Sequence, residues 1–116
     1  MKATSGKKFY RRGEVYWVNL DPTVGSETRK KRPCLIVSND IMNEMTDMVV
    51  VAPITSQVKR VYVSEVKTTV AKKTGKVMLH QCRAVDKSRL KEKLDHLDFD
   101  VMHLVDEAIK EVFGLS

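Results

Sequence analysis

Residues Met48 to Ile54, with the sequence MVVVAPI, form the longest apolar run of this 116-residue chain, and the polar residues Thr55-Ser56-Gln57 follow it at once. The run is far shorter than the ~20 residues that a helix needs to span a bilayer. A short run of this kind, rich in valine and apolar at successive positions, is typical of a strand that is buried on both faces. The run therefore predicts a buried strand, Met48 to Thr55, that ends in polar groups.

Further strand-like segments lie on both sides of this run. The first of them stops at Asp21-Pro22, because proline cannot donate to a strand ladder. A loop containing Gly25 follows it. Glycine also permits a turn at Thr74-Gly75, between the last two predicted strands. The predicted strands are Glu14 to Leu20, Pro33 to Asn39, Met48 to Thr55, Val61 to Val66 and Lys76 to Arg83, with one helical turn at Ile41 to Met45.

The C-terminal part of the chain has helical periodicity instead. Its apolar residues recur every three or four positions, as on one face of an amphipathic helix. Asp98 is a suitable N-cap and Gly114 fits the position after the last turn. A shorter helix is predicted at Ser88 to Leu94. Short strands followed by helices predict an α+β domain, an SH3-like small β-barrel of about five to seven strands with a C-terminal α-helix. The periodic residues are Val101, Leu104, Val105, Ala108, Ile109 and Val112.

Positive charge is concentrated in the N-terminal two-thirds of the chain. The net charge is +6, and Arg29-Lys30-Lys31-Arg32 forms one basic block. From residue 92 onward the sign reverses, because acidic residues outnumber the two lysines of that segment. This asymmetry predicts one face that binds a polyanion and one that faces away from it. We expect residues 1–10 to form a basic N-terminal tail and residues 11–116 to form the domain.

Motifs of several enzyme classes are missing from the sequence. It contains no GxxxxGK[ST] loop, no HExxH and no GxSxG, and its three histidines do not have the spacing of a metal-ligand pair. We therefore expect no metal site and no cofactor. Cys34 and Cys82 lack a CxxC spacing, and no apolar segment follows the N-terminus. Two reduced cysteines and no export signal predict a cytoplasmic protein without a membrane segment.

Polar groups capable of chemistry lie where predicted strands begin or end. Arg32 precedes Pro33, and a residue before proline is held in extended geometry. Its guanidinium is a planar fork of donors that matches phosphate oxygens. The buried run ends in the hydroxyl group of Thr55. A third polar stretch, His80-Gln81-Cys82-Arg83, interrupts an apolar segment.

Taken together, these stretches resemble the MazF/PemK/Kid family of toxin–antitoxin endoribonucleases. The resemblance spans about Arg11 to Leu115, in the family's order and spacing. The matching motifs are Arg12-Gly13-Glu14-Val15-Tyr16, Leu20-Asp21-Pro22, Gly25-Ser26-Glu27, Arg32-Pro33, Pro53-Ile54-Thr55-Ser56, Arg83-Ala84-Val85-Asp86-Lys87, Val105-Asp106-Glu107-Ala108 and Gly114-Leu115.

The resemblance implies a homodimer that cleaves single-stranded RNA, such as mRNA, at specific sequences without metal, and that a cognate MazE-like antitoxin blocks. It implies that Arg32 and Thr55 carry catalysis and that the loop Gly25 to Lys31 closes over RNA. The reaction is attack of a ribose 2′-OH on the adjacent phosphate. Glu27 and His80 are the two candidates for the general base; His80 departs from the family, whose members tend to carry an acidic residue there.

RNA positioning is expected from side chains that supply charge or paired hydrogen-bonding groups. Single-stranded RNA is the expected target because its bases are free to be read at their edges. A CcdB-like toxin that binds gyrase without catalysis, and an SH3-like nucleic-acid- or protein-binding adaptor, are the alternatives. The predicted RNA-binding residues are Ser26, Thr28, Arg29, Lys30, Lys31, Gln57, Gln81 and Arg83.

Overall fold

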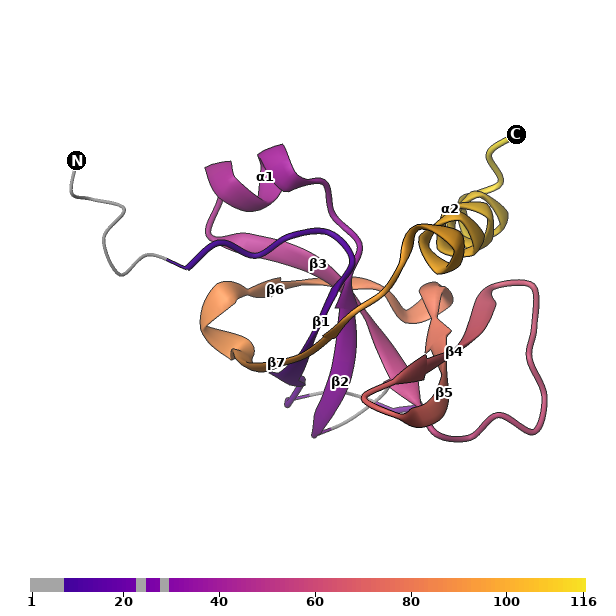
Figure 1. Cartoon of the computed structure of the whole chain (residues 1–116). Coiled ribbons are helices and arrows are strands. Elements are labelled where there is room, and N and C mark those ends of the chain that lie inside the picture. The colour runs from indigo at the N-terminus through magenta and orange to yellow at the C-terminus, as the bar shows by residue number, and fades with distance from the viewer. Residues whose placement is uncertain (1–7, 23–24, 28–29) are drawn as a thin grey trace.

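The computed structural model describes residues 8–22, 25–27 and 30–116 (Figure 1). Its seven strands form one sheet in the order β4-β5-β3-β2-β1-β7, with β6 paired to β3. The elements are β1 (Glu14–Asn19), β2 (Lys31–Ile36), α1 (Asp40–Met45), β3 (Met48–Thr55), β4 (Glu65–Val70), β5 (Lys73–Met78), β6 (Arg83–Asp86), β7 (Leu90–His96) and α2 (Phe99–Phe113), with 3₁₀ turns at Leu79–Gln81 and Lys87–Arg89.

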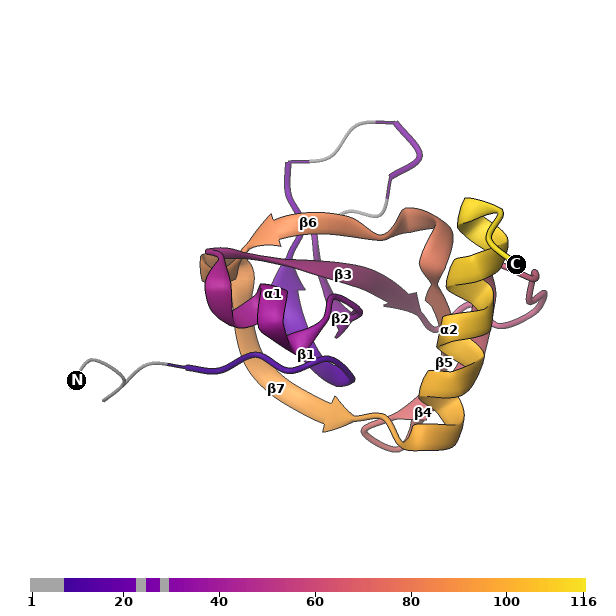
Figure 2. The ribbon, with the colours of Figure 1, turned by 90° about the horizontal axis from the view of Figure 1, so that it is seen from above.

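Strand β3 is the hub of the sheet. Its first half, from Met48 to Val51, pairs with β6, whereas its last residues, Ile54 and Thr55, pair with β5. Its other edge pairs with β2, where Cys34 lies opposite Pro53. All strand pairs are antiparallel, and the sheet curls into a partly open barrel that Figure 2 shows from above. The curl encloses one apolar cluster, and a second apolar cluster lies between the sheet and α2.

Helix α2 closes the barrel at the β4–β5 end (Figure 2). Asp98 caps it by accepting a hydrogen bond from the backbone N–H of Val101 at 3.0 Å, and Gly114 ends it in the left-handed conformation. Burial of Val105 and Ala108 holds the helix against the core. The predicted helix and both of its end signals are confirmed. No helix in the described part of the chain is long and apolar enough to cross a membrane.

The strand β3 and the helical turn α1 have the predicted positions, but the β4–β5 hairpin does not. Its turn lies at Ala71 and Lys72, both with positive φ, and not at Thr74-Gly75. Gly75 lies inside β5. A Cβ added at this position would come within 2.9 Å of the carbonyl oxygen of Thr55. The glycine therefore serves a close approach of two strands and not a turn.

Three further predictions differ from the structure. The segment Ser88 to Leu94 was predicted to be a short helix. It instead forms part of a 3₁₀ turn and most of β7, because it pairs with β1. The predicted strand Lys76 to Arg83 is interrupted by the 3₁₀ turn Leu79–Gln81, so His80 and Gln81 lie at a corner between β5 and β6. The second strand, predicted from Pro33 to Asn39, is Lys31–Ile36, because Asn39 instead caps α1 through the N–H of Met42.

Candidate active site

Arg32 and Thr55 line the same hollow, a pocket of about 410 Å³. The register between β2 and β3 accounts for this, since Cys34 lies opposite Pro53 and continuing the same register by two residues would set Arg32 across from Thr55. Residues two apart on a strand share one face. Two residues that are 23 positions apart in the sequence thus meet at the end of β3.

The guanidinium of Arg32 has an unused donor. Its Nε is buried and has no hydrogen-bond partner among the residues that the structure describes. Burying a donor without a partner costs roughly 1–3 kcal/mol, so native proteins rarely leave one unmatched. Arg32 lines the hollow, and its guanidinium would be a hydrogen-bond donor to an anion bound there. The donor set therefore fits a phosphate oxygen.

The hydroxyl group of Thr55 is held by its own backbone. Its oxygen accepts a hydrogen bond from the N–H of Gln57 at 3.2 Å. Because that bond occupies a lone pair of the oxygen, the hydroxyl hydrogen is left to donate elsewhere. The geometry thus presents a second donor beside Arg32. The side chain of Gln57 itself is exposed on the following loop.

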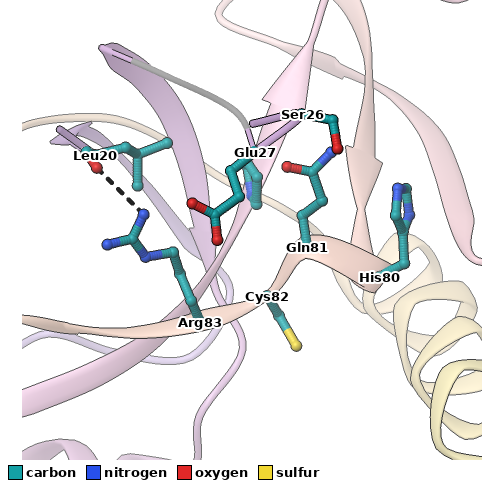
Figure 3. A pocket seen from close by; sticks show the side chains of 8 residues that line it. Leu20, Ser26, Glu27, His80, Gln81, Cys82 and Arg83 are labelled. Carbon is teal, nitrogen blue, oxygen red and sulfur yellow. Dashed lines mark hydrogen bonds between the residues drawn. The ribbon is translucent and has the colours of Figure 1, made fainter. Parts of the chain in front are cut away.

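A second hollow, of about 520 Å³, lies between the β1–β2 loop and the corner that precedes β6. Figure 3 shows the side chains of Ser26, Glu27, Gln81 and Arg83 around this space. The Glu27 carboxylate and the Arg83 guanidinium point toward each other, and the Gln81 amide points to Ser26. His80 lines the same hollow. Five residues predicted for the site from two separate stretches of sequence therefore surround one space.

Cys34 lies opposite Pro53, which lines the larger hollow. Burial raises the pKa of the Cys34 thiol to about 12, while the positive charges of Arg32 and Arg83 act in the opposite direction. Pro53 lines the larger hollow and Thr55 the smaller one, on the same face of β3. The end of β3 therefore borders both.

The two candidate bases differ in their surroundings. His80 is exposed, and its Nδ1 lies 3.3 Å from the Ser64 hydroxyl, which leaves Nε2 directed elsewhere. Glu27 is exposed on the β1–β2 loop.

Lys30, in the left-handed conformation, donates its backbone N–H to the Asp21 carboxylate at 2.9 Å. Lys31 borders the smaller hollow beside Arg32.

The predicted residues Thr28 and Arg29 lie outside the described residues. Arg83 has a structural bond in addition to its place in the hollow, because its Nη1 donates to the carbonyl of Leu20 at 3.2 Å. Arg89, which the sequence did not single out, donates to the carbonyls of Asn19, at 3.0 Å, and of Asp21. The two arginines together anchor the end of β1, from which the β1–β2 loop departs. No local sequence signal distinguishes Arg89 from other surface cations.

The sequence model of the family described as "PemK-like, MazF-like toxin of type II toxin-antitoxin system" matches residues 11–113 of this chain. The chain belongs to this toxin family. Endoribonuclease EndoA of Bacillus subtilis (strain 168) is 39% identical to this toxin over 105 residues, which cover 86% of the chain and 90% of that relative.

Solved structures of MazF toxins have the same fold. MazF (Form-I) from Deinococcus radiodurans superposes with a TM-score of 0.83 at 29% identity, over 94% of this toxin and all of that chain. An endoribonuclease in complex with its cognate antitoxin, from Mycobacterial species, superposes with a TM-score of 0.78 at 26% identity, over 92% and 97% of the two chains. The family and the α+β barrel with a C-terminal helix, both predicted from the sequence, are confirmed.

Proposed function

We propose that this toxin is an endoribonuclease that cuts single-stranded RNA at the hollow shared by Arg32 and Thr55. The observation that carries the proposal is that Arg32, with a buried N–H that has no partner among the described residues, and Thr55, whose hydroxyl is free to donate, line one hollow. An EndoA endoribonuclease at 39% identity supports it. The family assignment also favours the nuclease over a gyrase-binding toxin or an adaptor.

The proposed reaction is a transesterification. The ribose 2′-OH attacks the adjacent phosphorus and loses its proton to a base, while the 5′ oxygen of the next nucleotide leaves and takes up a proton. The products are a 2′,3′-cyclic phosphate and a free 5′-OH. Negative charge grows on the phosphorane oxygens in between, where fixed donors stabilise it most. Arg32 and Thr55 supply those donors, and removal of one such donor typically costs ~3 kcal/mol.

The general base is proposed to come from the larger hollow, where Glu27 and His80 both lie. The imidazole of histidine titrates near neutral pH and is suited to proton transfer. The pH–rate profile separates the two groups. If His80 is the base, His80→Gln abolishes the rise of the rate with pH, whereas Glu27→Gln abolishes it if the carboxylate is the base.

The RNA strand is proposed to run across both hollows. Lys30, Lys31 and Arg83 supply charge, and Ser26, Gln57 and Gln81 supply hydrogen-bonding groups, together with Thr28 and Arg29. An antitoxin that covers both hollows would block cutting, and the mycobacterial relative is known in complex with its cognate antitoxin. We further propose that the toxin acts as a homodimer, in the cytoplasm, and without a metal ion.

The deciding experiment incubates the toxin with a long transcript in EDTA and maps the new ends. Wild type is expected to give discrete cuts with 5′-OH and 2′,3′-cyclic phosphate ends. Arg32→Ala and Thr55→Val are expected to lose about 10²- to 10³-fold in rate while remaining folded by circular dichroism. Arg11→Ala, which removes an exposed arginine away from both hollows, is the matched control. Near-wild-type cutting by folded Arg32→Ala would refute the assignment.

A further inference from the structure

The loop between β3 and β4, residues 56–64, exposes three apolar residues in a row. Val61, Tyr62 and Val63 are 41%, 55% and 76% exposed. Runs of exposed apolar residues are unfavourable unless they serve a function. The loop extends away from the sheet (Figure 1), and it contains Lys59 and Arg60 but no acidic residue. The same short segment therefore offers an aromatic ring and two cations to the solvent.

Contacts with neighbouring residues fix the position of the Tyr62 ring. The ammonium of Lys76 lies 5.7 Å from the ring centroid, and Arg60 Nη1 donates to the Tyr62 hydroxyl at 3.3 Å. The backbone N–H of Tyr62 donates to Glu65 Oε1 at 2.9 Å. The Arg60 guanidinium also lies 5.9 Å from the ring centroid, so two cations hold the exposed ring in one orientation.

A buried ion pair supports this arrangement. Lys76 Nζ donates to Glu65 Oε1 at 2.9 Å and to the Arg60 carbonyl at 2.6 Å, and both charged side chains are at least nine-tenths buried. Burial alone would raise the pKa of Glu65, but the Tyr62 N–H and Lys76 together hold that pKa below its usual value. Buried ion pairs add little net stability compared with apolar packing. Their effect here is to orient the loop and its ring.

The contacts of the Tyr62 ring and its loop reach both hollows of the proposed RNA site. Lys76 is the β5 residue opposite Thr55 in the strand register. At the other end of the loop, the carbonyl of Ser64 accepts from the N–H of Leu79 at 3.0 Å, and the Ser64 hydroxyl lies 3.3 Å from His80. The ring is thus held by the residue next to the catalytic hydroxyl and by the corner that borders the larger hollow.

We propose that Tyr62 is a stacking platform for one unpaired base of the RNA, next to the nucleotides that are cut, with Lys59 and Arg60 facing the adjoining phosphates. Every base has a π-face, so a rigid exposed ring binds single strands with little sequence preference, and positive charge beside it follows the backbone. The absence of acidic residues from the loop favours a polyanion over a protein partner. This inference rests on the proposed endoribonuclease function.

The test uses a short RNA that contains one cut site, and a set of the same RNA with a single abasic nucleotide at each position around it. Stacking is worth about 1–3 kcal/mol per base, so Tyr62→Ala is expected to raise KM about 5- to 150-fold while kcat changes little. At the position whose base stacks on Tyr62, the abasic RNA is expected to bind wild type more weakly than the intact RNA does, by the same factor. Tyr62→Ala, which lacks the ring, is expected to bind the abasic and the intact RNA equally well.

Two variants make the result specific to the ring. Tyr62→Phe keeps the ring and is expected to keep the abasic dependence. Phe99→Ala removes another exposed aromatic residue, 83% exposed at the start of α2, and is expected to keep the wild-type KM. If wild type cuts RNA but Tyr62→Ala has the same KM and the same response to every abasic position, the platform is refuted and the ribonuclease function stands. Failure of wild type to cut would instead refute the function itself.

Discussion

Gly75 offers a test of how closely β5 must approach the end of β3, where Thr55 lies. In Gly75→Ala the new Cβ would lie 2.9 Å from the carbonyl oxygen of Thr55 and 3.1 Å from Cγ2 of Ile54, where ordinary contacts begin near 3.4 Å. The nearest atom belongs to the backbone and cannot rotate away. We therefore expect the end of β3 to move by about half an ångström (3.4 Å less 2.9 Å).

The size of the effect follows from that displacement. Overpacking of this kind costs about 1–3 kcal/mol, and replacing glycine in a strand returns about 0.5–1 kcal/mol of chain entropy. A net loss of about 1–2 kcal/mol should lower Tm by roughly 4–8 °C in a domain of this size. Misplacement of a catalytic group by 1 Å can cost 10²-fold, so half that shift at Thr55 should lower kcat about tenfold.

The assay combines thermal melting with single-turnover cleavage, measured at a temperature at which both proteins are folded. Thr74→Ala, at the exposed preceding position of β5, is the control and should keep both values. In a Thr55→Val background the hydroxyl is already absent, so Gly75→Ala should cause no further loss of rate although it still lowers Tm. A Gly75→Ala protein with wild-type kcat and Tm would refute the close approach, and with it the positioning of Thr55 by β5.

Three further predictions use groups elsewhere in the molecule. Glu65→Gln leaves Lys76 buried without its partner, so it should lower Tm strongly at pH 7. Because folding lowers the pKa of Glu65, the ionised carboxylate stabilises the fold at neutral pH, and this stabilisation is lost as pH falls below the unfolded value of 4.5. The difference in Tm between Glu65→Gln and wild type should therefore shrink in acid. A constant difference from pH 7 to 3 would contradict this. Cys34, buried and with its pKa raised to about 12, should resist iodoacetamide at pH 8 until urea unfolds the protein; mass spectrometry of native protein labelled at Cys34 would contradict its burial. If about four phosphates are contacted, the affinity of inactive Arg32→Ala for RNA, followed by fluorescence anisotropy, should fall with salt at a log–log slope near −3, and a flat response would argue against the basic face as the binding site.

Local sequence signals predicted the first and last residues of some elements. The buried run that forms β3 begins at Met48 and ends at Thr55 as expected, because a continuous apolar run followed by hydroxyl groups marks both ends. Helix α2 begins after Asp98 and ends before Gly114 for a similar reason, since a capping carboxylate and a left-handed glycine act within one turn. The position of Thr55 at a strand end followed from these bounds.

Other elements depended on contacts that no local pattern records. The β4–β5 turn uses Ala71 and Lys72 with positive φ, although Gly75 nearby is the better turn residue by propensity. The hairpin register and the approach of β5 to Thr55 decided the outcome instead. The segment from Ser88 to Leu94 reads as a helix by itself but pairs with β1, because tertiary pairing overrides a weak local preference.

The sequence by itself determined the family, the buried strand, the C-terminal helix and the kind of donors available for a phosphate, because each depends on residue type and short-range spacing. Only the tertiary structure decided that Arg32 and Thr55 line one hollow, that Lys76 pairs with Thr55 and lies against the ring of Tyr62, and that Glu27 and Arg83 border a second hollow. These contacts join residues far apart in the chain. They are decided by strand register and by the curl of the sheet, which depend on the packing of the whole domain.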